Sequence, residues 1–165
     1  MIVVADTSPL NYLVLIQEIE ILRSLYGTVV IPEEVLSELE DPGAPAEVAA
    51  WIARRPDWID VRVADPIGND PALLSVDPGE RAAILLAQRE LEVLLIIDDA
   101  AGRAEANRRN LPNTGTLGVL REAARRGLVD LPLALNRLMT TNFRVSRSLV
   151  RALLEENAAR LSGRD

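Results

Sequence analysis

The sequence predicts an α/β fold, a three-layer α/β/α sandwich with a central parallel sheet and further helices at its C-terminal end. One observation is that short runs of Val, Ile and Leu alternate with longer stretches of helical character over residues 1–127. This alternation is typical of successive β-α units. A second is that the runs at 2–5 and 93–97 lack polar alternation, as in strands covered on both faces.

The elements follow in order along the chain. Strands are expected at residues 2–5, 28–31, 58–63, 93–97 and 113–114. Helices are expected at about 8–16, 18–26, 32–40, 45–54, 77–91, 99–109, 117–126, 130–141 and 146–161. Ser8 is expected to cap the first helix, with Pro9 as its first residue. Residues 64–76 are the one long irregular stretch. We divide the chain into an α/β domain, 1–127, and a helical extension of that domain, 128–165.

The composition excludes several kinds of chemistry. A chain of 165 residues with 48% apolar content suits one compact domain. The sequence contains no cysteine or histidine, so thiol nucleophiles, zinc-thiolate sites and Ser-His-Asp triads are excluded. All 18 basic residues are arginine, which excludes Walker-A and Schiff-base lysines; biased genome composition explains this usage. Catalysis would therefore depend on carboxylates, hydroxyls, arginine or a metal.

The net charge of −7 is unevenly distributed. Residues 1–100 contain 6 arginines and 19 acidic residues, whereas residues 101–165 contain 12 arginines and 6 acidic residues. Such asymmetry indicates contact with nucleic acid or an acidic partner, or simply solvated helices. The N-terminus lacks the pattern of a signal peptide, and no apolar run approaches the ~20 residues of a membrane span. We therefore expect a cytoplasmic protein that does not bind a membrane.

Acidic residues follow two of the predicted buried strands. Asp6 follows strand 2–5, and Asp98 and Asp99 follow strand 93–97. Ligands of open α/β sheets bind beyond the carboxyl ends of the strands. Two carboxylates about 4 Å apart repel by roughly 4 kcal/mol at an effective dielectric near 20, so a cation is the natural partner. Oxygen-only ligands favour Mg²⁺ or Mn²⁺.

Two glutamates could join this group. Glu38 lies on the helix after the second strand, and Glu80 begins the helix that leads into strand 93–97. Each acid also has a structural interpretation. Asp6 could belong to a turn, and Asp77 and Glu80 fit a capping box. One of Asp98 and Asp99 is expected to cap the following helix, leaving the other for a metal.

These motifs together resemble the PIN-domain family of nucleases, including VapC-type toxins. The matching segments are IVVADTSPL, PEEVLSEL, DPGERAAILLA, LLIIDDAAGRAEA and TGTLGVL, and the last two helices resemble one PIN-like subfamily. The resemblance implies one or two Mg²⁺ or Mn²⁺ ions held by acids. By position these are Asp6, Glu38, Glu80 and either Asp99 or Asp98. The sequence departs from the family at Glu80, where aspartate is common, and at Ile97, where threonine is usual if Asp99 is the ligand.

The resemblance further implies a metal-dependent endoribonuclease, with Ser8 or Thr7, Arg103 and Thr116 near the substrate. It implies the toxin of a toxin–antitoxin pair, with RNA, a second copy of the chain and a small antitoxin as partners. Further arginines could follow the RNA backbone: Arg108, Arg109, Arg121, Arg125 and Arg126. Apolar residues of the late helices could form an interface or pack the core: Val119, Leu120, Leu135 and Leu138. The sequence leaves open the RNA target and the number of metals.

Two other functions would use some of the same residues. A non-catalytic PIN-like binding module is the alternative suggested by the departures at Glu80 and Ile97. An aspartyl-phosphate enzyme of the haloacid-dehalogenase type would need an aspartate two residues after Asp6, where Ser8 stands, and a lysine. The sequence therefore disfavours that chemistry.

Overall fold

A computed structural model describes residues 1–66 and 70–163, and its centre is a five-stranded parallel sheet. The strands are β1 (Ile2–Ala5), β2 (Val29–Pro32), β3 (Ile59–Arg62), β4 (Val93–Ile96) and β5 (Asn113–Thr114). Their order is β3-β2-β1-β4-β5, and every neighbouring pair is parallel. β1 therefore lies in the middle, and the predicted α/β architecture is confirmed.

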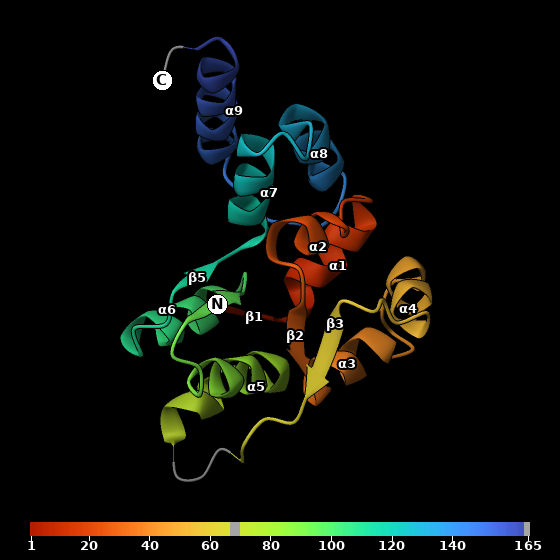
Figure 1. The fold of residues 1–165 in the computed structure, drawn as a ribbon, viewed down its shortest axis with the longest axis vertical. Coiled ribbons are helices and arrows are strands. Elements are labelled where there is room, and N and C mark those ends of the chain that lie inside the picture. Colours follow the sequence, from red (N-terminus) through yellow and green to blue (C-terminus); the bar gives the residue numbers. More distant parts are fainter. Residues whose placement is uncertain (67–69, 164–165) are drawn as a thin grey trace.

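Helices connect the strands and extend beyond the sheet (Figure 1). They are α1 (Thr7–Leu15), α2 (Ile21–Tyr26), α3 (Glu33–Glu40), α4 (Ala46–Ala53), α5 (Pro78–Ala87), α6 (Ala100–Arg108), α7 (Thr116–Arg125), α8 (Leu131–Met139) and α9 (Arg147–Leu161). A short 3₁₀ helix, Pro71–Ser75, lies within the stretch expected to be irregular; residues 67–69 of that stretch lie outside the described residues.

Some predicted boundaries were wrong. The first helix begins at Thr7, so Asp6, and not Ser8, occupies the N-cap position. The reason is that β1 pairs with β4 through Ala5, and the Asp6 N–H still donates to Ile96 O at 2.9 Å. Pro9 then falls within the first turn, where a missing N–H is tolerated. The fifth long helix was expected to reach residue 91, but α5 ends at Ala87.

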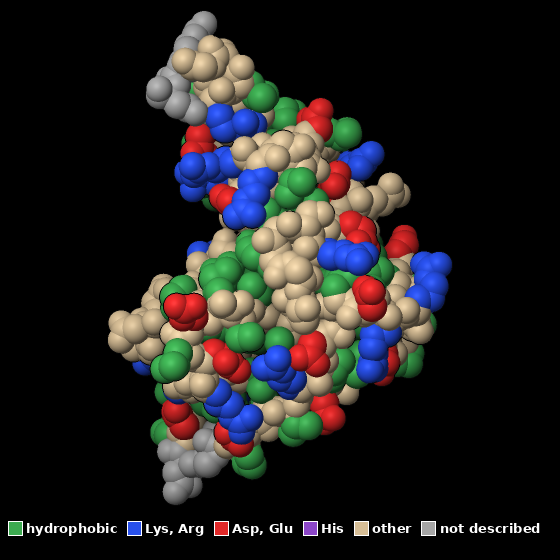
Figure 2. All heavy atoms as spheres, viewed as in Figure 1, with side chains coloured by type: hydrophobic (Ala, Val, Ile, Leu, Met, Phe, Trp, Pro, Cys, Tyr) green, Lys and Arg blue, Asp and Glu red, His purple; other side chains and the backbone are tan. Residues whose placement is uncertain are grey.

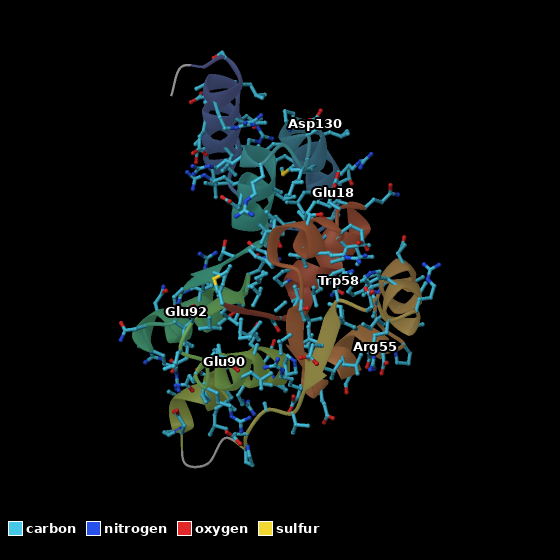
Figure 3. All side chains as sticks on the ribbon, viewed as in Figure 1. Glu18, Arg55, Trp58, Glu90, Glu92 and Asp130 are labelled. Carbon is cyan, nitrogen blue, oxygen red and sulfur yellow. The ribbon has the colours of Figure 1, made fainter. Side chains whose placement is uncertain are left out.

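The two faces of the sheet bury different side chains. Val3 and Ala5 of β1 pack into the larger apolar core with α1, α3 and α7, whereas Val4 packs into a second core with α5 and α6. This alternation follows from the period of two in a strand. Trp58 directly precedes β3 (Figure 3). It packs against Trp51 of α4, with ring centroids 6.0 Å apart. Both faces are therefore covered, as the apolar strands predicted.

The helices of the extension, α8 and α9, pack on α7, and the segment between them reaches α1, where Phe143 lies edge-on to Tyr12 with ring centroids 4.9 Å apart. Asp130 is the N-cap directly before α8 (Figure 3). Its side chain accepts a hydrogen bond from the Leu133 N–H. The four apolar residues considered for an interface are buried in the larger core: Val119, Leu120, Leu135 and Leu138. The interface interpretation of these residues was wrong, because each side chain fills the space between α7, α8 and their neighbours. Among the described residues, no helix has the length and apolarity needed to span a membrane.

Candidate active site at the carboxyl edge of the sheet

Asp6 lies at the carboxyl end of the central strand and is 3% exposed. Burial raises the pKa of this carboxyl from 3.8 to about 8. The Thr7 backbone N–H opposes the shift, while the charges of Glu80, Glu38 and Asp98 reinforce it. Asp6 therefore lies within range of three of the acidic residues that the sequence singled out, Glu38, Glu80 and Asp98.

Glu38 reaches this region from α3 and is fixed by two donors. The Thr7 hydroxyl donates to Glu38 Oε2, and the Gly79 N–H donates to Oε1 at 3.2 Å. Thr7 directly follows Asp6, and Gly79 directly precedes Glu80. The glutamate therefore connects the ends of three elements, α1, α3 and α5. A Cβ added at Gly79 would lie 2.6 Å from Glu38 Oε2, so a larger residue there would displace the Glu38 carboxylate from its present position.

Glu80 lies in the first turn of α5 and is 8% exposed. Its Oε2 accepts a hydrogen bond from the Asp77 N–H at 3.3 Å, the contact that the capping-box pattern predicted. Burial raises the pKa of Glu80 to about 7, with a further contribution from the charge of Asp99. A carboxylate that only caps a solvated helix would keep its usual pKa. The raised pKa of Glu80 therefore reflects its burial beside other acids as well as its capping contact.

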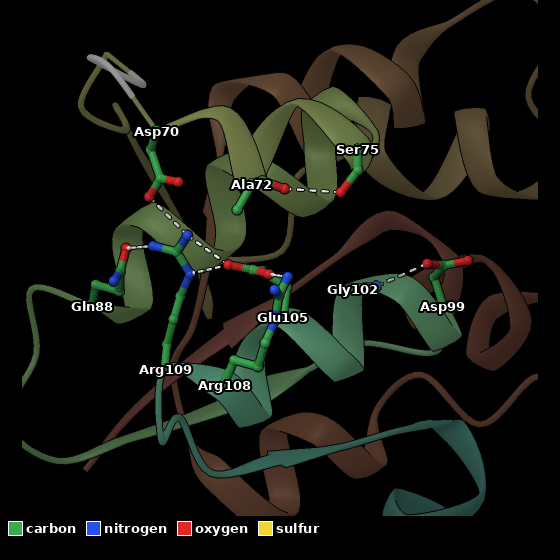
Figure 4. A network of polar contacts seen from close by, with 9 residues as sticks. All are labelled: Asp70, Ala72, Ser75, Gln88, Asp99, Gly102, Glu105, Arg108 and Arg109. Carbon is green, nitrogen blue, oxygen red and sulfur yellow. Dashed lines mark hydrogen bonds and ion pairs between the residues drawn. The ribbon is translucent and has the colours of Figure 1, made fainter.

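Asp98 and Asp99 have different surroundings. Asp99 is exposed and caps α6, since its Oδ2 accepts from the Gly102 N–H at 2.9 Å (Figure 4). Asp98 accepts two hydrogen bonds from Thr116, from the N–H at 2.7 Å and from the hydroxyl at 2.6 Å. Burial raises the pKa of Asp98 in spite of these donors. One of Asp98 and Asp99 was predicted to cap the following helix, and Asp99 is the residue that caps α6.

The residues expected near a substrate lie in different settings. Thr116 is fully buried, and its hydroxyl is directed at Asp98. Ser8 is half-buried in the first turn of α1. Arg103 is exposed on α6, and within the described chain it forms no ion pair. A Cβ added at Gly115 would lie 2.6 Å from Asp98 Oδ1 and 3.0 Å from Arg103 Nη1. Arg103 therefore borders the acidic group closely and is available to an anion.

Most of the expected arginine track is engaged in ion pairs. Arg109 donates to Glu105 Oε1 at 2.6 Å and to Asp70 Oδ2 at 2.7 Å, and Arg108 also pairs with Glu105 (Figure 4). Arg126 pairs with Glu122 at 2.8 Å. These ion pairs stabilise the surface around α6 and α7. The five arginines expected to follow the RNA backbone therefore do not form a continuous row of unpaired cations.

The acids form one electrostatic group, and the charge of Arg103 acts on it at Asp98 without forming an ion pair. Within residues 1–66 and 70–163, no ion pair engages Asp6, Glu38, Glu80, Asp98 or Asp99. The same part of the chain contains no three acidic side chains converging on one ready cation position. Mg²⁺ commonly takes only one or two carboxylates and completes its shell with water. The donor set consists of carboxylate oxygens alone, and it therefore fits a hydrated divalent cation.

A parallel sheet with helices on both faces and acids beyond the central strands defines a class of α/β proteins whose ligands bind at the carboxyl edge. A PIN-domain family profile matches residues 2–158. The chain therefore belongs to the PIN-domain family, whose members are generally nucleases that use divalent metals. No curated protein and no solved structure gives a significant match.

Three contacts of the site were not expected from the sequence. Gly79 donates to Glu38, Gly115 leaves room for Asp98, and Thr7, left as an alternative to Ser8, is the hydroxyl that contacts Glu38. A signal for both glycines was present, because each directly precedes a residue already singled out, Glu80 and Thr116. Their role depends on the distance between elements, which the sequence does not give.

Proposed function

We propose that this protein is a metal-dependent endoribonuclease that hydrolyses RNA phosphodiester bonds with Mg²⁺ or Mn²⁺. The observation that carries the proposal is that Asp6 and Glu80, from the ends of β1 and α5, are both buried at the carboxyl edge of the sheet, where the charge of Glu80 acts on Asp6. Burial raises their pKa values to about 8 and about 7. Buried carboxylates that repel one another are costly unless a proton or a cation offsets them. Near neutral pH, a divalent cation is the partner that would let both ionise.

Asp6, Asp98 and Glu80 would hold the metal, with Glu38 as a further ligand. Asp99, which caps α6, remains an alternative to Asp98 because its charge acts on Glu80. When bound, such a metal lowers the pKa of a water molecule and neutralises phosphate charge. The hydrogen bonds from Thr116 and Thr7 orient Asp98 and Glu38. Arg103, which borders Asp98, would bind a non-bridging phosphate oxygen of the substrate.

The direct experiment is cleavage of a structured RNA by the purified protein with Mn²⁺ and with EDTA. We expect cleavage only with the metal. Asp6→Asn should abolish it while the circular dichroism spectrum stays unchanged. Asp57→Asn is the control, since Asp57 is exposed and distant in sequence from the acidic group. Retained cleavage in Asp6→Asn, or equal cleavage in EDTA, would contradict the proposal.

A second candidate is a non-catalytic PIN-like module that binds RNA or a protein. It is favoured by Glu38, whose carboxylate is already held by Thr7 and Gly79, and by the absence of three converging acids in the described chain. Titration calorimetry with MnCl₂ separates the two candidates. Metal binding with RNA cleavage supports the nuclease, whereas RNA binding without detectable metal binding supports the module.

The finer proposal is that the nuclease is the toxin of a toxin–antitoxin pair and forms a homodimer. Exposed apolar side chains on the extension support an interface there: Leu133, Met139, Leu149 and Leu161. Sedimentation velocity would detect a dimer, and a protein that stays monomeric at all concentrations would contradict that part. Growth arrest on induction of the wild-type chain, absent with Asp6→Asn, would support the toxin role; unimpaired growth would oppose it.

A further inference from the structure

A cavity of about 250 Å³ lies between α7 and α9, apart from the acidic group. Arg121 and Arg125 enter it from α7, and Arg160 enters it from α9. Figure 2 shows basic side chains gathered over these two helices. One acidic residue, Glu156, faces the three arginines. The lining is therefore positively charged, although the chain as a whole carries a charge of −7.

The polar contacts hold part of this arginine group in place. Arg121 binds Glu156 through two hydrogen bonds, at 2.8 Å and 2.5 Å. Arg160 donates to Asn157 Oδ1 at 3.1 Å, and Asn157 is only 7% exposed. Arg125 and Arg160 form no ion pair within the described residues. The guanidinium groups of Arg125 and Arg160 therefore have no ion-pair partner among the described residues, and they lie beside the Arg121–Glu156 ion pair.

The side chains that line the cavity favour anionic ligands. Guanidinium groups recognise carboxylate and phosphate oxygens, and they do so with a planar fork of donors. The remaining lining residues are Ala124 and Leu131, so no aromatic ring in this cavity could stack on a base. Recognition here would be of phosphate and would not depend on base identity.

The place of the cavity along α7 relates it to the acidic group. Thr116, which holds Asp98, is the first residue of α7, and Arg121 and Arg125 follow on the same helix. At 1.5 Å per residue, Arg125 is about 14 Å along the helix from Thr116. In a stacked, helical strand, each nucleotide advances about 3.4 Å along the axis. A stacked strand cut at the acidic group would therefore bring a phosphate to this cavity about four nucleotides away.

We propose that the cavity lined by Arg121, Arg125 and Arg160 is a phosphate subsite that holds the RNA backbone about four nucleotides from the cleaved bond. The inference rests on the proposed nuclease function and adds a substrate-length requirement to it. RNA long enough to reach from the acidic group to α9 gains affinity from this subsite, and RNA that is too short does not.

The test compares two double variants that remove the same charge. Arg125→Ala with Arg160→Ala alters the cavity, whereas Arg147→Ala with Arg151→Ala removes two exposed arginines of α9 that do not line it. Binding of labelled single-stranded oligouridylate is measured in EDTA by fluorescence anisotropy at several salt concentrations. For an RNA of about twelve nucleotides, we expect the cavity variant to bind about tenfold more weakly and the salt slope to fall by about 1.4.

The control variant should lose less than about threefold and keep its slope. Equal losses in both variants, or no loss in the cavity variant, would overturn the subsite. The same holds if a polyglutamate peptide displaces the RNA at equal concentration, since the cavity would then bind acidic protein segments. Thermal melting of each variant checks that the fold is intact.

Cleavage separates this inference from the proposed function. With Mn²⁺, the cavity variant should lose kcat/KM on the RNA of about twelve nucleotides and retain it on one of about four, which is too short to bridge the two sites. Equal loss on both lengths would overturn the subsite. If the wild-type protein cuts neither RNA, the nuclease proposal fails, and the binding comparison still decides whether the cavity holds phosphate.

Discussion

Replacing Asp6 by asparagine should stabilise the metal-free protein at alkaline pH. The pKa of Asp6 is raised from 3.8 to about 8 by burial and by the neighbouring acids. Well below pH 3.8 the carboxyl is protonated in both the folded and unfolded states and contributes nothing to the pH dependence. As the pH rises toward 8, the unfolded state releases its proton and the folded state does not, so the free energy of unfolding falls.

The magnitude follows from the size of the shift. Each pKa unit corresponds to about 1.4 kcal/mol, so the full shift sets a ceiling of about 6 kcal/mol. Water entry and side-chain relaxation offset part of this cost. We therefore expect Asp6→Asn to raise the free energy of unfolding by about 2–3 kcal/mol at pH 8 and by almost nothing at pH 4. The melting temperature should rise by about 5–10 °C at pH 8.

The assay is urea unfolding followed by circular dichroism in EDTA, from pH 4 to pH 8.5. The Asp57→Asn control changes an exposed carboxylate and should shift the free energy by less than about 0.5 kcal/mol at any pH. Added Mn²⁺ should stabilise the wild type and leave Asp6→Asn unchanged. A variant that is less stable than the wild type at pH 8 would refute the reasoning, because Asp6 would then be an ionised residue that the fold itself stabilises.

The remaining predictions concern the other contacts of the site and the extension. Glu38→Gln should weaken Mn²⁺ binding at least about tenfold by calorimetry, while Glu34→Gln, an exposed change on the same helix, should not; equal affinities would remove Glu38 from the ligands. Gly115→Ala should reduce RNA cleavage, because the new Cβ would lie 2.6 Å from Asp98 Oδ1, and full activity would mean that the position of Asp98 is unimportant. Leu138→Ala should cost about 2–5 kcal/mol in urea unfolding because this side chain is fully buried; a cost below about 1 kcal/mol would show that α8 is not part of the core.

The sequence was most informative where a residue's role depends on its own strand or helix. The apolar runs at 2–5 and 93–97 predicted central strands, and β1 and β4 are adjacent in the sheet. The acids after those strands were predicted to share one edge, and the charges of Glu80, Glu38 and Asp98 all act on Asp6. Both predictions follow from the parallel sheet, which places all carboxyl ends on one side.

The sequence was least informative where a role depends on the distance between elements. In the sequence, Asp98 and Asp99 are equally suited to cap the helix or to bind a metal. The structure distinguishes them, because Thr116, 18 residues after Asp98, donates two hydrogen bonds to Asp98. Leu138 was equally suited to an interface and to a core, because apolar periodicity does not say what covers a face. The cavity between α7 and α9 likewise arises from the packing of α9 on α7, and no local pattern specifies it.

The central claim is that the acids beyond β1 and β4 hold a divalent cation. A crystal soaked in Mn²⁺, with anomalous scattering recorded, tests it most directly. We predict one or two peaks within about 2.0–2.4 Å of carboxylate oxygens of Asp6 and of Asp98 or Asp99. A fully soaked crystal with no anomalous density beside Asp6, or with Asp6 and Glu80 in contact with each other and no metal between them, would contradict it.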